Sequence, residues 1–203
     1  YTGAILSLLI QAGYAQDPRI ERGMQWLLSM RQFDHGWTIP ILTHKFDRAT
    51  QYRLTSQYAP PVEPDRSKPF SHNWTGMVLR AFAAHPTYRH SEAAWTAARL
   101  LKSRFFQPDV YSSYQAASYW VRFEYPFWWN NLVTALDSLS WIGLRADDEH
   151  IRQGVDWLIA HQEQNGLWRG SYVYQSTIET PKTRATEHWG SLAICRCLKR
   201  LFG

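Results

Sequence analysis

The stretch RGMQWLLSMRQFDHGW, residues 22–37, joins a basic residue and glycine to an apolar helical run, a glutamine and a closing Gly-Trp pair. A similar stretch, RQGVDWLIAHQEQNGLW, recurs at residues 152–168, and a degenerate copy at residues 93–107 lacks the Gly-Trp pair. The interval between Trp26 and Trp157 leaves room for one further helical hairpin. This repetition predicts helical hairpins that bury their faces by stacking on their neighbours.

Helical periodicity covers most of the remaining sequence. Apolar residues recur at helical spacing in three pairs of segments and one unpaired segment: residues 2–13 with 19–32, 71–85 with 91–106, 129–143 with 147–162, and finally 183–203. Asp17-Pro18 and either Asp147 or Asp148 can begin helices, and Gly143 can end one. Segments that are apolar nearly all round alternate with segments that have a polar far face. The sequence therefore predicts one all-α domain over residues 1–203.

A long proline-rich loop at residues 38–72 interrupts the helical rhythm. Loops of this length in a compact domain either cover a functional site as a lid or are simply mobile. Nothing in the spacing of its His44, Asp47 and Tyr52 selects a chemistry. We therefore leave both interpretations of the loop open.

Composition limits the class of protein without fixing its function. The chain has 203 residues, of which 45% are apolar and 15% aromatic, so it can bury a real core and is not disordered. Its eleven tryptophans and eleven tyrosines either fill that core or line a cavity for an apolar ligand. The longest apolar run, residues 3–13, is too short to span a bilayer, although it could lie on one.

Charge and cysteine usage favour a cytoplasmic protein without nucleic-acid partners. The net charge of +5 comes from basic residues scattered along the sequence, a pattern typical of a solvated surface. Cys195 and Cys197 point to opposite sides of a helix, so they can neither pair nor chelate a metal together. The chain begins at Tyr1 without a charged leader, from which we expect a trimmed or fragmentary N-terminus and no secretory signal.

The repeated stretches resemble the QW motif of squalene and hopene cyclases, in the wider prenyltransferase and squalene oxidase repeat family. The shared pattern runs from a basic residue and glycine, through an aromatic residue and leucine, to Gln32 with Trp37 in one copy and Gln162 with Trp168 in the other. In such a motif the glutamine can cap the N–H groups of the next helix while the tryptophan stacks beneath it. Each outer helix is then tied to the following inner helix.

The resemblance implies a partial α/α toroid, with inner helices around a central axis, an outer jacket of helices, and a cavity at the mouth where the inner helices begin. A closed toroid of this family contains more hairpins than the chain supplies. We therefore expect an arc, a fragment, or a half that a second copy completes as a homodimer. Exposed inner faces at the ends of the arc favour such association.

Two chemistries of the wider family leave no signature in the sequence. Cyclases that protonate an alkene resemble one another in an aspartate-rich acid motif, but the nearest run here, residues 147–150, lies where it would cap an outer helix. Protein prenyltransferases resemble one another in a zinc site built from an aspartate, a cysteine two residues later and a distant histidine. That spacing is missing, so we expect no metal and no cofactor. Asp137, on an inner helix, is the remaining solitary carboxylate candidate for catalysis.

Residues 119–131 form an aromatic segment that leads into an inner helix. If this segment is extended, Arg122 and Glu124 face the same way and form an ion pair at the rim of an aromatic cavity. The alternative is a buried loop in which the two side chains pair because neither can be buried alone. The ligand-binding candidates at this and the equivalent helix starts are Asn73, Trp74, Arg122, Glu124, Trp128, Trp129, Asn130, Asn131 and Trp189.

Glu187 and His188 form a second pair of candidates, at the start of the last inner helix. Glu187 could act as a general acid or base with His188 as its partner, since both would project near the cavity mouth. In the structural alternative, Thr186 caps the helix and Glu187 is an acid in its first turn. With Asp137, these two residues complete the catalytic candidates.

Three functions fit these observations. The first is a terpene-cyclase-like or prenyltransferase-like repeat protein that binds or transforms a hydrophobic isoprenoid-type ligand in a central aromatic cavity, with peripheral membrane contact through residues 125–129. The second is a non-catalytic helical-repeat scaffold that binds another macromolecule through its concave face. The third is a carbohydrate-active α/α toroid, because aromatic platforms and paired carboxylates suit glycan cleavage.

Overall fold

The computed structural model describes residues 1–56, 58–111, 116–170 and 180–203. Within these ranges all the regular structure is helical, as the sequence predicts. The α-helices are α1 (Thr2–Leu9), α2 (Pro18–Ser29), α3 (Arg48–Leu54), α4 (His72–Ala84), α5 (Glu92–Lys102), α6 (Leu132–Ile142), α7 (Glu149–Ala160) and α8 (Pro181–Phe202). None of the helices in the described ranges combines the length and apolar character needed to cross a bilayer.

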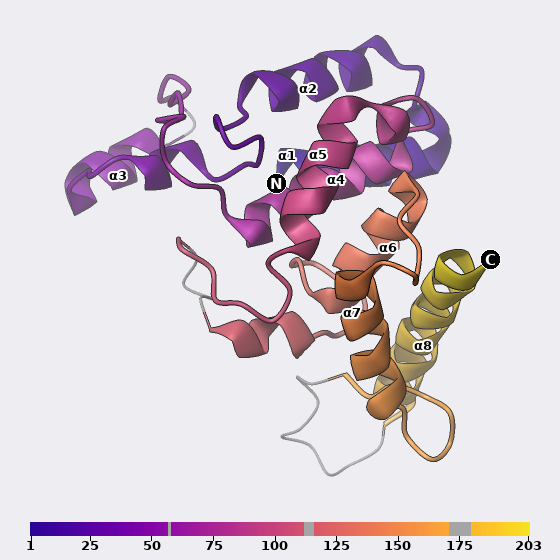
Figure 1. The fold of residues 1–203 in the computed structure, drawn as a ribbon. Helices are drawn as coiled ribbons and strands as arrows, with labels where there is room; N and C mark the ends of the chain where they lie inside the picture. The colour runs from indigo at the N-terminus through magenta and orange to yellow at the C-terminus, as the bar shows by residue number, and fades with distance from the viewer. Residues whose placement is uncertain (57, 112–115, 171–179) are drawn as a thin grey trace.

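Four helices form the inner layer of an arc, and they pack on one another in the order α1, α4, α6 and α8 (Figure 1). Three helices form the outer layer: α2 lies against α1 and α4, α5 against α4 and α6, and α7 against α6. Inner and outer helices alternate along the chain because each hairpin pairs one of each kind. The fold is therefore a partial α/α toroid.

The helix ends follow the capping signals in the sequence. Asp17 accepts a hydrogen bond from the backbone N–H of Arg19 at the start of α2, and Pro18 occupies the first helical position. Asp148 caps α7 in the same way. Gly143 ends α6 with a φ of 121°, which a side-chain-bearing residue rarely adopts. The starts of α2 and α7 and the end of α6 therefore lie where the capping signals predict them.

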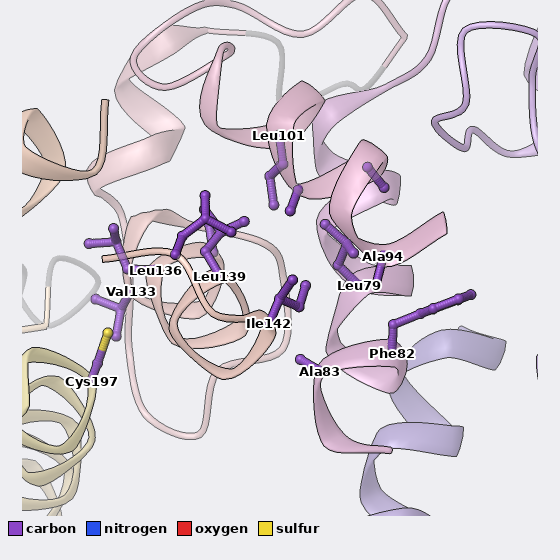
Figure 2. Close-up of a cluster of buried hydrophobic side chains, with 14 of the residues drawn as sticks. Leu79, Phe82, Ala83, Ala94, Leu101, Val133, Leu136, Leu139, Ile142 and Cys197 are labelled. Carbon is purple, nitrogen blue, oxygen red and sulfur yellow. The ribbon is translucent and has the colours of Figure 1, made fainter. Parts of the chain in front are cut away.

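The core lies between the two layers of helices. The largest fully buried side chain is that of Trp120, in the 3-10 segment Ala117–Val121. The other large ones come from α2, α4, α5, α6 and α7, among them Met24, Leu79, Phe82, Leu101, Leu136, Leu139, Ile151 and Leu158. Figure 2 shows this core around α4, α5 and α6, with Cys197 reaching it from α8. Burial raises the pKa of the Cys197 thiol to about 12, whereas Cys195 is exposed on the other side of the helix. The two thiols are therefore separated, as expected.

The glycine of each clear repeat lets an outer helix approach the inner helix before it. A Cβ on Gly23 of α2 would lie 2.9 Å from Cδ2 of Leu6 in α1. A Cβ on Gly154 of α7 would lie 3.0 Å from Cδ1 of Leu132 in α6. Both distances are shorter than normal carbon contacts, so a small residue at this position permits the close packing of the hairpin.

The tryptophan of each clear repeat ties the outer helix to the inner helix after it. The indole nitrogen of Trp37 donates to the carbonyl of Leu27 near the end of α2, and the Trp37 backbone N–H donates to the hydroxyl of Thr75 in α4 at 2.9 Å. Trp168 repeats the pattern, because its indole donates to the carbonyl of Leu158 in α7 and its backbone N–H donates to the hydroxyl of Ser191 in α8 at 2.9 Å. The two carbonyls also accept backbone N–H groups, from Met30 and His161, so each indole adds a second hydrogen bond at the end of an outer helix.

The glutamine of the repeat does not cap the next helix, which corrects the expectation from the motif. The side-chain amide of Gln32 donates to the carbonyls of Asp65 and Lys68, at 2.8 and 3.1 Å, and so holds the loop before α4. The amide of Gln162 donates to the carbonyl of Gly166 within its own turn. The N-cap of α4 is instead Ser71, since its hydroxyl is closer in sequence to the free N–H groups.

The degenerate middle repeat uses a tryptophan that sequence alignment of the copies missed. The indole nitrogen of Trp120, in the 3-10 segment Ala117–Val121, donates to the carbonyl of Gln107 after α5 at 3.0 Å. The Trp120 ring stacks on His72 at the start of α4, with ring centroids 4.5 Å apart. The middle repeat therefore also uses a tryptophan to contact an inner helix, although a longer segment separates this tryptophan from its outer helix.

Candidate functional site

A cavity of about 770 Å³ opens on the concave side of the arc. All four inner helices line it, together with the 3-10 segment Tyr88–His90 and residues 125–127 before α6. None of the described residues in the 38–72 loop lines this cavity, and Figure 1 shows α3 of that loop on the far side of the molecule from α8. The loop contains the 3-10 segment Pro40–Thr43 as well as α3, and it is no lid over this cavity.

One face of α6 forms the floor of the cavity. Val133, Thr134, Asp137, Ser138 and Trp141 all line it, and their spacing of three or four residues places them on a single helical face. Because an α-helix rises about 1.5 Å per residue, the floor is about 12 Å long from Val133 to Trp141. The cavity therefore extends along the inner helices and is not confined to their starts, where the sequence analysis placed it.

Basic side chains dominate the wall of the cavity. Its cations are Arg80 of α4, Arg89 of the 3-10 segment, and Arg196, Lys199 and Arg200 of α8. Among the described lining residues, one carboxylate, that of Asp137, faces these five cations. The basic residues are scattered in sequence, but the fold gathers part of them at one place. The expectation of a dispersed, merely solvated charge is therefore wrong for this group.

Trp141 brings two of the guanidinium groups together. The guanidinium of Arg89 lies 5.2 Å from the centre of the Trp141 ring, and that of Arg200 lies 4.7 Å from it. Both distances are typical of cation–π contacts. Arg200 also donates to the hydroxyl of Ser140 at 2.9 Å and to the carboxylate of Asp137. Arg200 is therefore held at the end of the cavity by three partners on α6.

Asp137 lies in the cavity, where the sequence analysis expected a catalytic carboxylate. Burial raises its pKa above the usual range, whereas Arg200, Arg80 and Arg196 act in the opposite direction by favouring the charged form. Burial likewise lowers the pKa of Arg80, whose guanidinium donates to the carbonyl of Trp128 at 3.0 Å. The carboxylate of Asp137 thus accepts a hydrogen bond from Arg200, and this arrangement does not favour its use as a proton donor.

Aromatic residues form the other wall of the cavity. Tyr125 and Phe127 line it, and their rings pack edge to face with centroids 5.6 Å apart. Trp189 of α8 stacks on Tyr125, with centroids 6.2 Å apart. The candidates Trp189 and Trp128 are about half exposed, at 55% and 45%. Trp189 therefore backs the aromatic wall of the cavity.

Other predicted aromatic residues gather where α1, α4 and α6 begin. Tyr1 contacts the rings of Trp128 and Trp129, at centroid distances of 5.8 and 6.4 Å. Trp74 meets Trp129 edge to face at 5.8 Å. The structure thus brings together Trp74, Trp128 and Trp129, but as a cluster packed on itself beside the cavity wall.

The predicted asparagines have structural positions. Asn131 is the N-cap of α6 and forms a capping box with Thr134. Asn130 donates to the carbonyl of His72 at 3.3 Å and packs so tightly on Gly76 that a Cβ there would lie 2.0 Å from its Oδ1 atom. Asn73 is buried beside them. These asparagines hold the starts of α4 and α6.

A second cavity of about 20 Å³ lies at these helix starts, lined by His72, Asn73, Asn130 and Trp129 among others. It is too small for an isoprenoid chain. Burial lowers the pKa of His72 to about 4, partly opposed by Asp109, and its Nδ1 atom has no hydrogen-bond partner among the described residues. The mouth that the sequence analysis favoured is therefore largely filled by side chains.

Arg122 and Glu124 do not form the expected ion pair. Both residues lie in the described part of the chain and both are exposed, and no contact within 4 Å links their charged groups. The guanidinium of Arg122 lies over the ring of Tyr119 instead, 4.6 Å from its centre. The segment is not extended throughout, because Ala117–Val121 forms a 3-10 helix. The two residues are consequently not held together in a buried loop.

Glu187 and His188 do not meet as an acid–base pair. The last inner helix, α8, begins at Pro181 with Thr180 as its N-cap, so Thr186 is not the cap and Glu187 is not in the first turn. The carboxylate of Glu187 pairs with the guanidinium of Arg169 at 3.4 Å, and His188 is exposed. Both residues lie outside the larger cavity. Their role in catalysis remains a prediction without geometric support.

One feature of the sequence could have predicted part of the basic wall. Arg196, Lys199 and Arg200 are spaced three and four residues apart, which places them on one face of a helix. The apolar residues of the same helix face the core, so this basic face must point away from it. Nothing in the sequence linked that face to Arg80 or Arg89, because only the packing of α4 and α8 on α6 brings these residues together.

The arrangement of inner and outer helices around this cavity defines an arc of an α/α-toroid repeat protein. The family model of the squalene-hopene cyclase C-terminal domain matches residues 3–199, and the chain belongs to this family. The chain is similar to a squalene–hopene cyclase of Bradyrhizobium diazoefficiens, with 25% identity over 186 residues. This match covers 88% of the chain and 26% of the relative, so the chain spans about a quarter of that protein. The comparison with solved structures gave no significant match.

Proposed function

We propose that the concave cavity binds a hydrophobic isoprenoid-type ligand. The observation that carries this proposal is the cavity itself, whose volume of about 770 Å³ lies in the range of small-molecule sites. Tyr125, Phe127 and Val133 offer an apolar wall to such a ligand. Membership of the squalene-hopene cyclase C-terminal family supports a terpenoid class of ligand, since the matched relative is named for squalene and hopene.

The chemistry of the lining favours binding over proton-initiated cyclisation by this chain alone. An acid that protonates an alkene must hold a proton, and burial raises the pKa of Asp137 in that direction. The carboxylate nevertheless accepts a hydrogen bond from Arg200, and Arg80 and Arg196 also favour its charged form. Among the described lining residues no second carboxylate stands beside it. Glycan cleavage by paired carboxylates lacks support for the same reason.

The proposal is tested by filling the cavity. Ala193 of α8 lines it, whereas Ala185 of the same helix is exposed outside it, so Ala193→Trp and Ala185→Trp form a matched pair. We expect farnesol to bind the wild type and Ala185→Trp in titration calorimetry and to lose affinity for Ala193→Trp. Equal binding by all three proteins, or no binding to the wild type, overturns the proposal.

Two further measurements address the source of the ligand. Native mass spectrometry of the gently purified protein should reveal a bound molecule of isoprenoid mass, which Ala193→Trp should lack. Flotation with phosphatidylcholine vesicles tests the membrane contact that we propose for residues 125–129. Co-flotation that Trp128→Ser abolishes supports that contact, and the absence of any flotation contradicts it.

A further inference from the structure

We infer that the ligand of this cavity carries an anionic phosphate-type head group, which Arg89, Arg196 and Lys199 hold at the Trp141 end. This inference rests on the proposed function, because it specifies the chemistry of the molecule that the cavity binds. It makes the ligand amphipathic, with a hydrocarbon part against the aromatic wall and a charged part at the basic wall.

The charge imbalance is the first argument. Five cations and a single carboxylate line the cavity within the described ranges, and that carboxylate is already bonded to Arg200. Positive charges that share a partly desolvated space repel one another. Burial already lowers the pKa of Arg80, which shows the cost of desolvating its charge. A neutral hydrocarbon would deepen this desolvation without supplying any counter-charge. A ligand with two or more negative charges would neutralise the excess positive charge of the cavity.

Free hydrogen-bond donors are the second argument. The Nε atom of Arg89 is buried and has no hydrogen-bond partner among the described residues. Arg196 and Lys199 are exposed on the cavity side of α8, and no side-chain hydrogen bond or ion pair joins either of them to another residue in the described part of the protein. Guanidinium groups match phosphate oxygens with paired donors, and an ammonium adds a compact charge. The basic wall thus presents donors that no protein group occupies.

The separation of the two walls is the third argument. On the floor of the cavity, Val133 and Trp141 are about 12 Å apart along the helix axis, given the rise of about 1.5 Å per residue. Tyr125 and Phe127 belong to the segment that leads into the Val133 end, whereas Arg200 and Arg89 contact Trp141 at the opposite end. Of the lining cations, Arg80 lies towards the aromatic segment, because its guanidinium donates to the carbonyl of Trp128. A linear molecule with one apolar and one charged end fits this polarity.

The experiment compares three probes that divide the proposed ligand into its parts: farnesyl diphosphate, farnesol and inorganic diphosphate. In titration calorimetry on the whole chain, farnesyl diphosphate should bind at least roughly tenfold more tightly than farnesol, as expected for charge-assisted hydrogen bonds. The double variant Arg196→Gln/Lys199→Gln should lose roughly tenfold in affinity for farnesyl diphosphate and leave farnesol binding unchanged.

A matched control removes the same charge elsewhere. Lys45 and Arg48 are exposed in the 38–72 loop and lie outside the cavity, so Lys45→Gln/Arg48→Gln should bind all three probes as the wild type does. Circular dichroism of both double variants checks that they fold, which we expect because the four substituted side chains are exposed.

The outcomes separate this inference from the proposed function. Equal affinities for farnesyl diphosphate and farnesol overturn the anionic head group and leave the proposed function standing. Binding of inorganic diphosphate with no contribution from the farnesyl chain overturns the isoprenoid ligand and keeps the anion site. Failure of all three probes overturns both, and equal losses in the two double variants show an effect of net charge alone and overturn the assigned site.

Discussion

The indole nitrogen of Trp37 donates to the carbonyl oxygen of Leu27 at 2.6 Å, and that carbonyl lies in the last turn of α2. The same relationship joins Trp168 to Leu158 in α7 at 2.7 Å. Both tryptophans are almost fully buried, at 2% and 4% exposure. A buried indole N–H without an acceptor costs free energy, so this bond makes the position specific for tryptophan and not merely for a large apolar residue.

Replacing either tryptophan by phenylalanine tests this specificity. Trp37→Phe and Trp168→Phe keep a ring but remove one hydrogen bond, and each should lower the free energy of unfolding by about 1 kcal/mol or somewhat more in urea denaturation, since the smaller ring also loses packing. Trp26 is 43% exposed and serves as the control, since Trp26→Phe should change the stability by less than about 0.5 kcal/mol. Equal effects at all three positions would show that the hydrogen bond is unimportant.

The buried His72 should make stability depend on pH. Its pKa in the folded protein is about 4, below the ordinary value of 6.5, so the unfolded chain binds a proton first as the pH falls. The contribution is present above about pH 6.5 and is lost as the pH falls towards 4, by up to about 3 kcal/mol. His72→Phe keeps the stacking on Trp120 and should flatten this part of the stability curve.

The control for this effect is His188→Phe, because His188 is exposed. Thermal unfolding at several pH values between 4 and 7 should give the wild-type slope for His188→Phe and a smaller slope for His72→Phe. A wild-type slope in His72→Phe would mean that other groups produce the pH dependence.

Removing the carboxylate from the basic cavity should strengthen anion binding. Asp137→Asn removes the carboxylate that Arg200 bonds and leaves the cations unopposed, so inorganic diphosphate should bind several-fold, roughly threefold to tenfold, more tightly. The stability should change by no more than about 1 kcal/mol, because the lost bond to Arg200 is offset by removal of the buried charge whose desolvation raises the pKa of Asp137. Calorimetric titration checks the first change and urea denaturation the second. Weaker binding of diphosphate to Asp137→Asn would contradict the assigned site.

The ends of the arc should govern self-association. Ile5 and Leu8 of α1 are 51% and 56% exposed, and Leu192 of α8 is 43% exposed, so we propose that further helices, such as those of a second copy, cover these faces. Light scattering should show concentration-dependent dimers that Ile5→Glu/Leu8→Glu disperses. Ile159→Glu on the outer helix α7, where Ile159 is 55% exposed, should not disperse them. A stable wild-type monomer that melts cooperatively would contradict completion by a second copy.

The sequence predicted the parts of the fold that depend on neighbouring residues. Hairpins, caps and the alternation of inner and outer helices follow from local periodicity, and Asp17, Asp148 and Gly143 lie where these signals placed them. The sequence pattern alone makes the glycine and the tryptophan of the two clear copies equivalent. Local patterns succeed here because each contact joins an element to the next one along the chain.

The candidate site was harder to predict, because its residues come from distant segments. Asp137 was identified as an isolated carboxylate, but its partner Arg200 lies 63 positions further along the chain. Glu187 and His188 were misplaced because the start of α8 at Thr180 precedes the expected one. Trp120 was missed as a repeat residue because its distance from the acceptor Gln107 differs from that in the other copies.

The glycine contact and the tryptophan bond have a consequence for how the arc opens. The outer helices α2 and α7 are each held to the inner helix before them through Gly23 or Gly154 and to the inner helix after them through Trp37 or Trp168. These contacts join adjacent units, as in other solenoids, so amide protons should exchange with solvent fastest in α1 and α8 and slowest in α4. The molecule should fray from its two ends inward.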